Sequence, residues 1–198
     1  MFQIKMPKII FRYGTMNSSK TANLLMVAYN YQVQNKAIFL IKPSCDTRDS
    51  ENKIVSRAFK EGVSCNLIIT PEIDDINPYL PKDINIACIL VDECQFLSSI
   101  NINALRTINQ DVPIICYGLR TDFTTKLFPG SMRLFEIADT IEEIKTVCVN
   151  CNHKAIINSK FTIKENGTKE ILYSGNQFDL GGEEKYEPVC WNCWVRNY

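Results

Sequence analysis

The sequence has 198 residues, of which 45% are hydrophobic and 22% are charged, as in an ordinary folded protein and unlike a disordered or fibrous one. Lysine plus arginine and aspartate plus glutamate number 22 each, which argues against a chain that coats nucleic acid or an anionic membrane and favours small-molecule partners. No apolar run is long enough to span a bilayer, and residues 1–10 lack the features of a secretory signal, so we expect a cytoplasmic protein.

The first predicted elements are a strand from Lys8 to Tyr13, a loop, and a helix from Thr21 to Tyr31 that contains no glycine or proline. Apolar spacing after a serine predicts a crossover helix from Ser99 to Gln110. Three more short apolar runs predict strands that are buried on both faces: Ala37 to Ile41, Ile86 to Val91 and Pro113 to Tyr117. The predicted fold class is therefore α/β, with a parallel sheet flanked by helices.

The loop after the first strand has the spacing of a phosphate-binding loop. Gly14, Lys20 and Thr21 satisfy the pattern G-x-x-x-x-G-K-[ST], but Ser19 replaces the second glycine. In such loops the backbone N–H groups face the phosphates, the lysine neutralises the β and γ oxygens, and the threonine hydroxyl ligates Mg²⁺. Ser19 is tolerable if its φ is negative, whereas a positive φ would cost about 1 kcal/mol. The predicted ATP-binding residues of the loop are Gly14, Thr15, Met16, Asn17, Ser18, Ser19, Lys20 and Thr21.

The strand from Ile86 to Val91 ends in a carboxylate pair, Asp92 and Glu93. A Mg²⁺-nucleotide site needs such a pair, with one carboxylate for the metal's water shell and one to accept a proton. A pair that is merely solvated is the alternative. Because ligands bind at the carboxyl ends of parallel strands, we expect the phosphate loop and this pair to converge from neighbouring strand ends on one triphosphate.

Four of the nine cysteines form two C-x-x-C pairs around a predicted hairpin, which runs over Ala155 to Lys164 and Glu170 to Ser174 with a turn at Asn166-Gly167. Four thiolates at this spacing suit a tetrahedral Zn²⁺, and redox thiols or core cysteines are the alternatives. With all four positions filled by protein, the zinc would be structural, and His153 would be a bystander. The predicted ligands are Cys148, Cys151, Cys190 and Cys193.

These patterns predict two domains. Residues 1–145 would form a P-loop nucleotide-binding α/β domain, and residues 146–198 a small zinc-ribbon-like β domain. Between the cysteine pairs, residues 175–187 are rich in glycine and carboxylates. Because the zinc would fix the base of this segment, we expect it to act as a lid over a small ligand.

Four further motifs follow one another along the chain: K-P-x-x-D-T-R at Lys42 to Arg48, D-E-x-Q-F at Asp92 to Phe96, Y-G-L-R-T-D-F at Tyr117 to Phe123, and G-G-x-x-K-Y at Gly181 to Tyr186. With the phosphate loop and the cysteine pairs, this set resembles the type II thymidine kinases over nearly the whole chain. The resemblance implies transfer of the ATP γ-phosphate to the 5′-hydroxyl of thymidine, in nucleotide salvage for DNA synthesis. It also implies a cytoplasmic homotetramer that uses ATP, catalytic Mg²⁺ and structural Zn²⁺.

The resemblance further implies residue roles. Glu93 would accept the 5′-hydroxyl proton, Asp92 and Thr21 would organise Mg²⁺, and Asp92 and Gln95 would join the ATP-binding set. Backbone groups of the lid would read the edge of the thymine ring, which is a physically sensible way to reject purines. The implied substrate-binding residues are Met16, Asp46, Arg48, Phe96, Leu119, Phe123, Phe128, Gln177, Phe178, Asp179, Leu180, Gly181 and Tyr186.

Three residues depart from the pattern of the family. Ser19 replaces a glycine, Cys94 stands where the residue is usually small, and Asn158 stands where a threonine often lines the pocket for the thymine methyl group. Ser19 bears on ATP affinity, and Asn158 bears on the preference between thymine and uracil.

Two other functions use parts of the same pattern. Asp92-Glu93-Cys94 resembles a helicase box, so the chain could be a nucleic-acid-dependent ATPase, but it lacks the length for a second lobe and has a neutral charge balance. The zinc hairpin could instead be an interaction module on a degenerate nucleotide-binding scaffold, an interpretation that draws only on Ser19.

Overall fold

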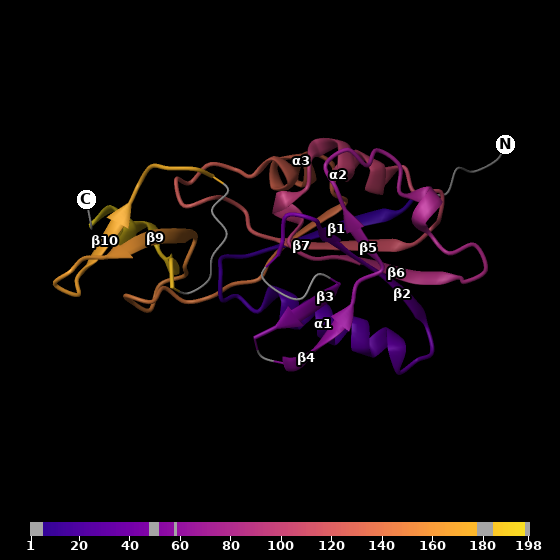
Figure 1. The fold of residues 1–198 in the computed structure, drawn as a ribbon, viewed down its shortest axis with the longest axis horizontal. Helices are drawn as coiled ribbons and strands as arrows, with labels where there is room; N and C mark the ends of the chain where they lie inside the picture. The colour runs from indigo at the N-terminus through magenta and orange to yellow at the C-terminus, as the bar shows by residue number, and fades with distance from the viewer. Residues whose placement is uncertain (1–5, 48–51, 58, 178–183, 197–198) are drawn as a thin grey trace.

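The structure is a computed structural model, and it describes residues 6–47, 52–57, 59–177 and 184–196. These residues form a six-stranded sheet, a three-stranded sheet and a two-stranded hairpin (Figure 1). Five predicted substrate-binding positions lie outside the described residues: Arg48, Phe178, Asp179, Leu180 and Gly181.

All strand pairs in the six-stranded sheet are parallel, and the strand order is β5-β2-β6-β7-β1-β8. The four strands predicted from apolar runs, β1, β2, β6 and β7, form the centre of this sheet, so the predicted α/β class is confirmed. The two edge strands were not predicted. The bounds are β1 Lys8–Tyr13, β2 Ala37–Pro43, β5 Leu67–Ile69, β6 Ile86–Val91, β7 Pro113–Gly118 and β8 Thr140–Glu143.

Helices cover both faces of the sheet (Figure 1). Helix α1, Lys20–Gln32, packs on β2, β6 and β7, while α2, Ser99–Arg106, and α3, Pro129–Ile137, pack together on the other face. Strand β6 shows why its sequence is continuously apolar: Ile89 and Val91 belong to the core under α2 and α3, and Cys88 and Leu90 belong to the core under α1.

The crossover helix is shorter than predicted. Ser98 is its N-cap, because the Ser98 hydroxyl accepts a hydrogen bond from Asn101 N–H, and Ser98 N–H donates one to Asn101 Oδ1. The helix ends at Arg106, before the polar residues that had been included in the prediction. The two-stranded hairpin, β3 Lys53–Ser56 and β4 Phe59–Ser64, was not predicted.

The C-terminal sheet has the order β10-β9-β11 and is antiparallel. Its bounds are β9 Ile157–Ile163, β10 Lys169–Leu172 and β11 Tyr186–Val189, and helix α4, Trp191–Val195, follows. The predicted β9–β10 hairpin is confirmed, and Gly167 in its turn has a φ of 81°, which favours glycine.

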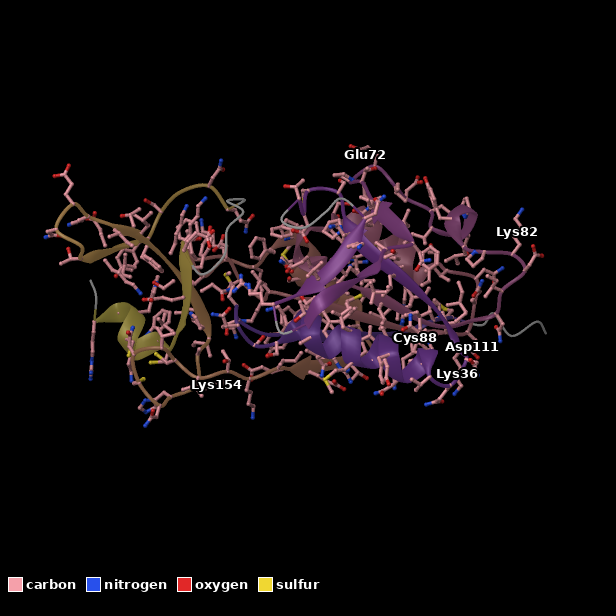
Figure 2. All side chains as sticks on the ribbon, turned by 60° about the horizontal axis from the view of Figure 1, so that its bottom comes forward. Lys36, Glu72, Lys82, Cys88, Asp111 and Lys154 are labelled. Atoms are coloured by element: carbon pink, nitrogen blue, oxygen red, sulfur yellow. The ribbon has the colours of Figure 1, made fainter. Side chains whose placement is uncertain are left out.

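The carboxyl ends of the central strands face the C-terminal sheet. Figure 2 shows Lys36 and Asp111, which precede β2 and β7, at the end of the molecule farther from that sheet, and Lys154 near it. Lys154 Nζ lies 2.8 Å from Glu143 Oε2 at the end of β8, which ties the two regions together. Within the described residues, none of the helices is both long enough and apolar enough to cross a membrane.

Candidate nucleotide and metal sites

The predicted phosphate loop connects β1 to α1. Gly14 starts it in a space that only glycine fits, because a Cβ there would lie 2.4 Å from Ser18 Oγ and 2.5 Å from Ile144 O. The side chain of Lys20 is buried, and its Nζ donates a hydrogen bond to Thr15 O at 2.7 Å. The loop therefore wraps around the lysine as the sequence pattern predicts.

Ser19, which replaces the second glycine of the loop pattern, has a positive φ. Its φ of 61° and ψ of 30° are left-handed, and its side chain makes no capping hydrogen bond to α1. The loop requires this conformation for the residue before the lysine, and serine adopts it at a cost of about 1 kcal/mol. Of the two conformations considered from the sequence, Ser19 therefore has the one with positive φ, which carries this cost.

A Ser19→Gly variant is expected to raise the melting temperature by a few degrees at most, because the relief of left-handed strain is partly offset by the greater flexibility of glycine in the unfolded chain. Activity should stay within a few-fold of the parent protein. Asn35→Gly is the matched control, since Asn35 has a φ of 54° in the turn after α1. Thermal unfolding and steady-state kinetics test both variants, and complete loss of activity in Ser19→Gly would give the serine hydroxyl a task in the reaction.

The phosphate loop and the acidic pair converge. Thr21 Oγ1 lies 3.2 Å from Asp92 Oδ2 and 3.4 Å from Asp92 Oδ1, and Asp92 is buried. The predicted meeting is confirmed, but the strands are not neighbours, because β7 lies between β1 and β6. A hydroxyl beside a carboxylate is an oxygen set that suits Mg²⁺.

Glu93 begins the short helix η2, Cys94–Phe96, in a left-handed conformation with a φ of 48°. Strain of this kind at a half-buried carboxylate is typical of a functional site. Oε2 of Glu93 accepts a hydrogen bond from Gln95 Nε2, and Gln95 Oε1 accepts one from Leu119 N–H at 2.9 Å. The carboxylate is therefore held in place from the side of β7.

Cys94, one of the three departures from the family pattern, is a packing residue. Its side chain is fully buried, and burial raises the pKa of its thiol well above the ordinary value. Gly118 makes room for it, because a Cβ at that position would lie 2.6 Å from Cys94 Sγ. A neutral thiol in this setting is not a nucleophile.

The predicted aromatic residues form two pairs. The rings of Phe96 and Phe128 meet edge to face with centroids 5.8 Å apart, and those of Phe123 and Tyr186 lie 6.4 Å apart. Phe123 lies in the segment after β7 and Tyr186 comes from β11, so the second pair joins this segment to the C-terminal sheet.

The other predicted substrate residues are placed as follows. Gln177 Nε2 donates to Leu127 O at 3.2 Å, next to Phe128. Asp46 is buried just beyond the carboxyl end of β2. Both therefore lie near the edge of the sheet where the phosphate loop and the acidic pair meet.

Asn158 connects the C-terminal sheet to the phosphate loop. Its Oδ1 accepts a hydrogen bond from Met16 N–H at 2.7 Å, and its Nδ2 donates to Thr121 O at 3.3 Å. Arg120 supports the same junction by donating to Ile156 O at 3.1 Å. Asn158, Thr121 and Arg120 border a small cavity with Thr15, whose buried Oγ1 has no hydrogen-bond partner among the described residues.

Arg57 is a residue near the site that the sequence analysis missed. It follows β3 in the β3–β4 hairpin, and its Nη1 donates to Asn17 Oδ1 in the phosphate loop at 3.1 Å. No motif marks it, because only the position of the hairpin over the loop brings the two residues together.

The four predicted metal ligands also come together. Their Sγ atoms all lie within 4.8 Å of one another, and Cys151 Sγ lies 3.6 Å from both Cys190 Sγ and Cys193 Sγ. Zinc–sulfur bonds of about 2.3 Å in a tetrahedron place the sulfurs about 3.8 Å apart, so the spacing is compatible with zinc. His153 Nδ1 lies 3.4 Å from Cys151 Sγ, beside the cluster.

Hydrogen bonds shift the pKa values of Cys148 and Cys193 in opposite directions. Burial raises the pKa of Cys148, but hydrogen bonds from backbone N–H groups, including that of Asn150, outweigh burial and lower the pKa to about 7. Hydrogen bonds with Cys151 and Cys190 raise the pKa of Cys193 to about 12. Sulfurs this close resist carrying several negative charges together, which is the situation that a divalent cation relieves.

The chain resembles known proteins over nearly its full length. The family model described as "Thymidine kinase" matches residues 7–194. A thymidine kinase of Lactiplantibacillus plantarum is 39% identical over 190 residues, covering 93% of this chain and 94% of the relative. Those of Streptococcus agalactiae and Enterococcus faecalis are 40% and 39% identical over 190 residues, covering 93% of this chain and 95% and 93% of the relatives. The match thus includes both the main sheet and the C-terminal one.

Proposed function

The chain belongs to the thymidine kinase family, and on this premise we propose that it transfers the γ-phosphate of ATP to the 5′-hydroxyl of thymidine. The observation that carries the proposal is the approach of Thr21 Oγ1 to the Asp92 carboxylate, because it joins the phosphate loop to an acidic pair at one edge of the sheet. Phosphoryl transfer depends mainly on such positioning and on charge neutralisation.

We propose the following roles at this edge. Lys20 neutralises the β- and γ-phosphates, Thr21 and Asp92 hold Mg²⁺, and Glu93 accepts the proton of the 5′-hydroxyl. Bound Mg²⁺ would neutralise charge on the β and γ oxygens. The remaining phosphate-loop residues, Gly14 to Ser19, supply backbone N–H groups to the phosphates.

The nucleoside would occupy the space between the main sheet and the C-terminal sheet. In this proposal two pairs of rings flank the base: Phe96 with Phe128, and Phe123 with Tyr186. The position of these pairs at the carboxyl edge of the sheet supports this role. Met16, Leu119, Gln177 and Asp46 complete the described part of the set. The positions Arg48, Phe178, Asp179, Leu180 and Gly181 belong to it through the family resemblance.

We further propose two domains, 1–145 and 146–198, with a structural Zn²⁺ held by the four clustered cysteines. The spacing of their sulfurs supports zinc, and a filled set of four protein ligands supports a structural role. The metal would close the segment between Cys151 and Cys190, which contains the lid.

A cytoplasmic homotetramer is also proposed. Exposed Met26, Tyr29 and Val33 follow one another at helical spacing along one side of α1, and an apolar stripe of this kind favours a subunit contact. A monomer mass in sedimentation equilibrium would contradict the tetramer.

Transfer of labelled phosphate from ATP to a panel of deoxynucleosides tests the central proposal. Thymidine should be phosphorylated, deoxyuridine less efficiently, and purine deoxynucleosides hardly at all, because an enclosed site rejects larger bases. ATP hydrolysis that depends on added DNA, without any labelled nucleotide product, would instead identify a nucleic-acid-dependent ATPase. Failure to bind Mg²⁺-ATP at millimolar concentration would leave only a non-enzymatic scaffold.

A further inference from the structure

Gln95 lies directly between the proposed base and the end of β7. Its side chain is 0% exposed, and its two polar atoms have different partners. Nε2 donates to Glu93 Oε2 at 2.5 Å, and Oε1 accepts from Leu119 N–H at 2.9 Å. The family resemblance implies an ATP-binding role for Gln95, but a fully buried amide whose oxygen and nitrogen both have partners within the protein is suited to a different task.

The orientation of this amide follows from its partners. A carboxylate only accepts hydrogen bonds and a backbone N–H only donates them. Exchanging Oε1 and Nε2 would therefore place an oxygen acceptor against the Glu93 carboxylate and an N–H donor against Leu119 N–H. The two hydrogen bonds together therefore require the amide of glutamine at this position. Aspartate or glutamate lacks the donor for Glu93, and an apolar side chain lacks both bonds.

Leu119, the second hydrogen-bond partner of Gln95, is itself held in place. Leu119 follows β7, and its carbonyl oxygen accepts a hydrogen bond from the buried Ser131 hydroxyl at 2.5 Å. Gly118 lets η2 pack closely against this strand, because a Cβ there would lie 2.6 Å from Gln95 Oε1. The amide of Gln95 thus fixes the Glu93 carboxylate relative to the end of β7.

The backbone conformation of Glu93 has to be stabilised by neighbouring residues. Its backbone is in the left-handed region, with a φ of 48° and a ψ of 38°, a conformation that persists only when the surroundings fix it. Gln95 Nε2 donates to Oε2 of this carboxylate and so fixes the direction in which the side chain of Glu93 extends. A base that is held by a third group presents its acceptor atom in one direction, as catalytic bases generally require.

We propose that Gln95 is a positioning residue for phosphoryl transfer: through its hydrogen bond to Oε2 it anchors the Glu93 carboxylate to the end of β7 and so holds the base in place for the 5′-hydroxyl of the nucleoside. This rests on the proposed function, in which Glu93 is the base. Gln95 acts on the reaction through Glu93 and makes no contact with ATP.

Gln95→Met tests the proposal, because methionine has a similar volume and makes neither hydrogen bond. It should lower kcat about 10- to 100-fold, as expected for a misplaced reacting group, while KM for ATP and for thymidine change less than about threefold. Gln95→Asn, one methylene shorter and unable to reach both partners, provides a milder second variant. Asn101→Leu is the matched control: Asn101 is 1% exposed, and its Nδ2 donates to Thr70 O and Ile73 O away from the site. It should lower the melting temperature and leave kcat unchanged.

Combining Gln95→Met with Glu93→Gln separates the possible roles. If Gln95 acts through the carboxylate, the double variant should be no slower than Glu93→Gln alone, within about twofold. Multiplied losses in the double variant would overturn the proposal. So would a raised KM for ATP at normal kcat in Gln95→Met, which would identify a direct contact, or a lower melting temperature at normal kcat, which would identify packing alone.

The role of Glu93 as base and the positioning role of Gln95 can be tested separately. Near-normal turnover in Glu93→Gln would remove the base that the proposed function assigns, and the positioning role with it. Loss of turnover in Glu93→Gln together with a normal kcat in both Gln95 variants would overturn the positioning role and leave the proposed function intact.

Discussion

A Glu93→Gln variant is expected to bind ATP and thymidine normally and to lose about 10²- to 10⁴-fold in kcat, the usual contribution of a general base. Glutamine keeps the size of the side chain but cannot accept a proton from the 5′-hydroxyl. Asp92 and Thr21, which lie within hydrogen-bond distance of each other, are not changed, so the proposed metal site should survive. Steady-state kinetics and calorimetric titration with Mg²⁺-ATP give the two quantities separately.

The control for this variant is Glu136→Gln. Glu136 lies on the surface of α3, where it pairs with Arg133, and its charge takes no part in the proposed site. Its kcat should equal that of the parent protein. If Glu93→Gln also turned over at a nearly normal rate, Glu93 would not be the base, and the nearby Asp92 would be the next carboxylate to test.

A Cys148→Ser variant is expected to bind no zinc and to lose thymidine phosphorylation by at least about 100-fold, because the reacting groups would no longer be aligned. Structural zinc contributes about 10–16 kcal/mol in small zinc-binding peptides, more than a small sheet can replace from its own core. The small core of the C-terminal sheet is built around the same cysteines, as Cys148 and Cys190 pack there with Ile157 and Trp194.

Metal analysis of the purified protein should find one zinc per chain, and none in Cys148→Ser. Cys65→Ser is the matched control, because Cys65 lies outside the cluster, and its single S–H proton is shared between Leu40 O and Leu67 O, acceptors that also suit a serine hydroxyl. That variant should keep both its zinc and its activity. Full activity in protein from which the metal has been removed would contradict the structural role of zinc.

The central strands could be predicted because each is buried on both faces. Strands β1, β2, β6 and β7 are therefore nearly continuous runs of apolar residues. The edge strands lack this signal: β5 has three residues, and β8 reads Thr-Ile-Glu-Glu. Helix α3 was missed although Pro129 opens it, since Gly130 follows directly and weakens the helical pattern.

The candidate site could be predicted as a set of residues but not as a geometry. The motifs identified Lys20, Thr21, Asp92 and Glu93, but the strand order, with β7 between β1 and β6, depends on pairing that local sequence does not encode. Ser19 is a second example. Its own preference is for negative φ, and the tertiary course of the loop overrides it. Arg57 reaches the phosphate loop only because an unpredicted hairpin carries it there.

Asn158 serves two neighbours with one side chain. It replaces the threonine that often lines the methyl pocket in the family, and its Oδ1 holds the N–H of Met16 in the phosphate loop. A substitution of Asn158 that is designed to accept a different pyrimidine would also remove the acceptor of the Met16 N–H. Under the proposed function, we therefore expect substitutions of Asn158 to change base selectivity and affinity for ATP together.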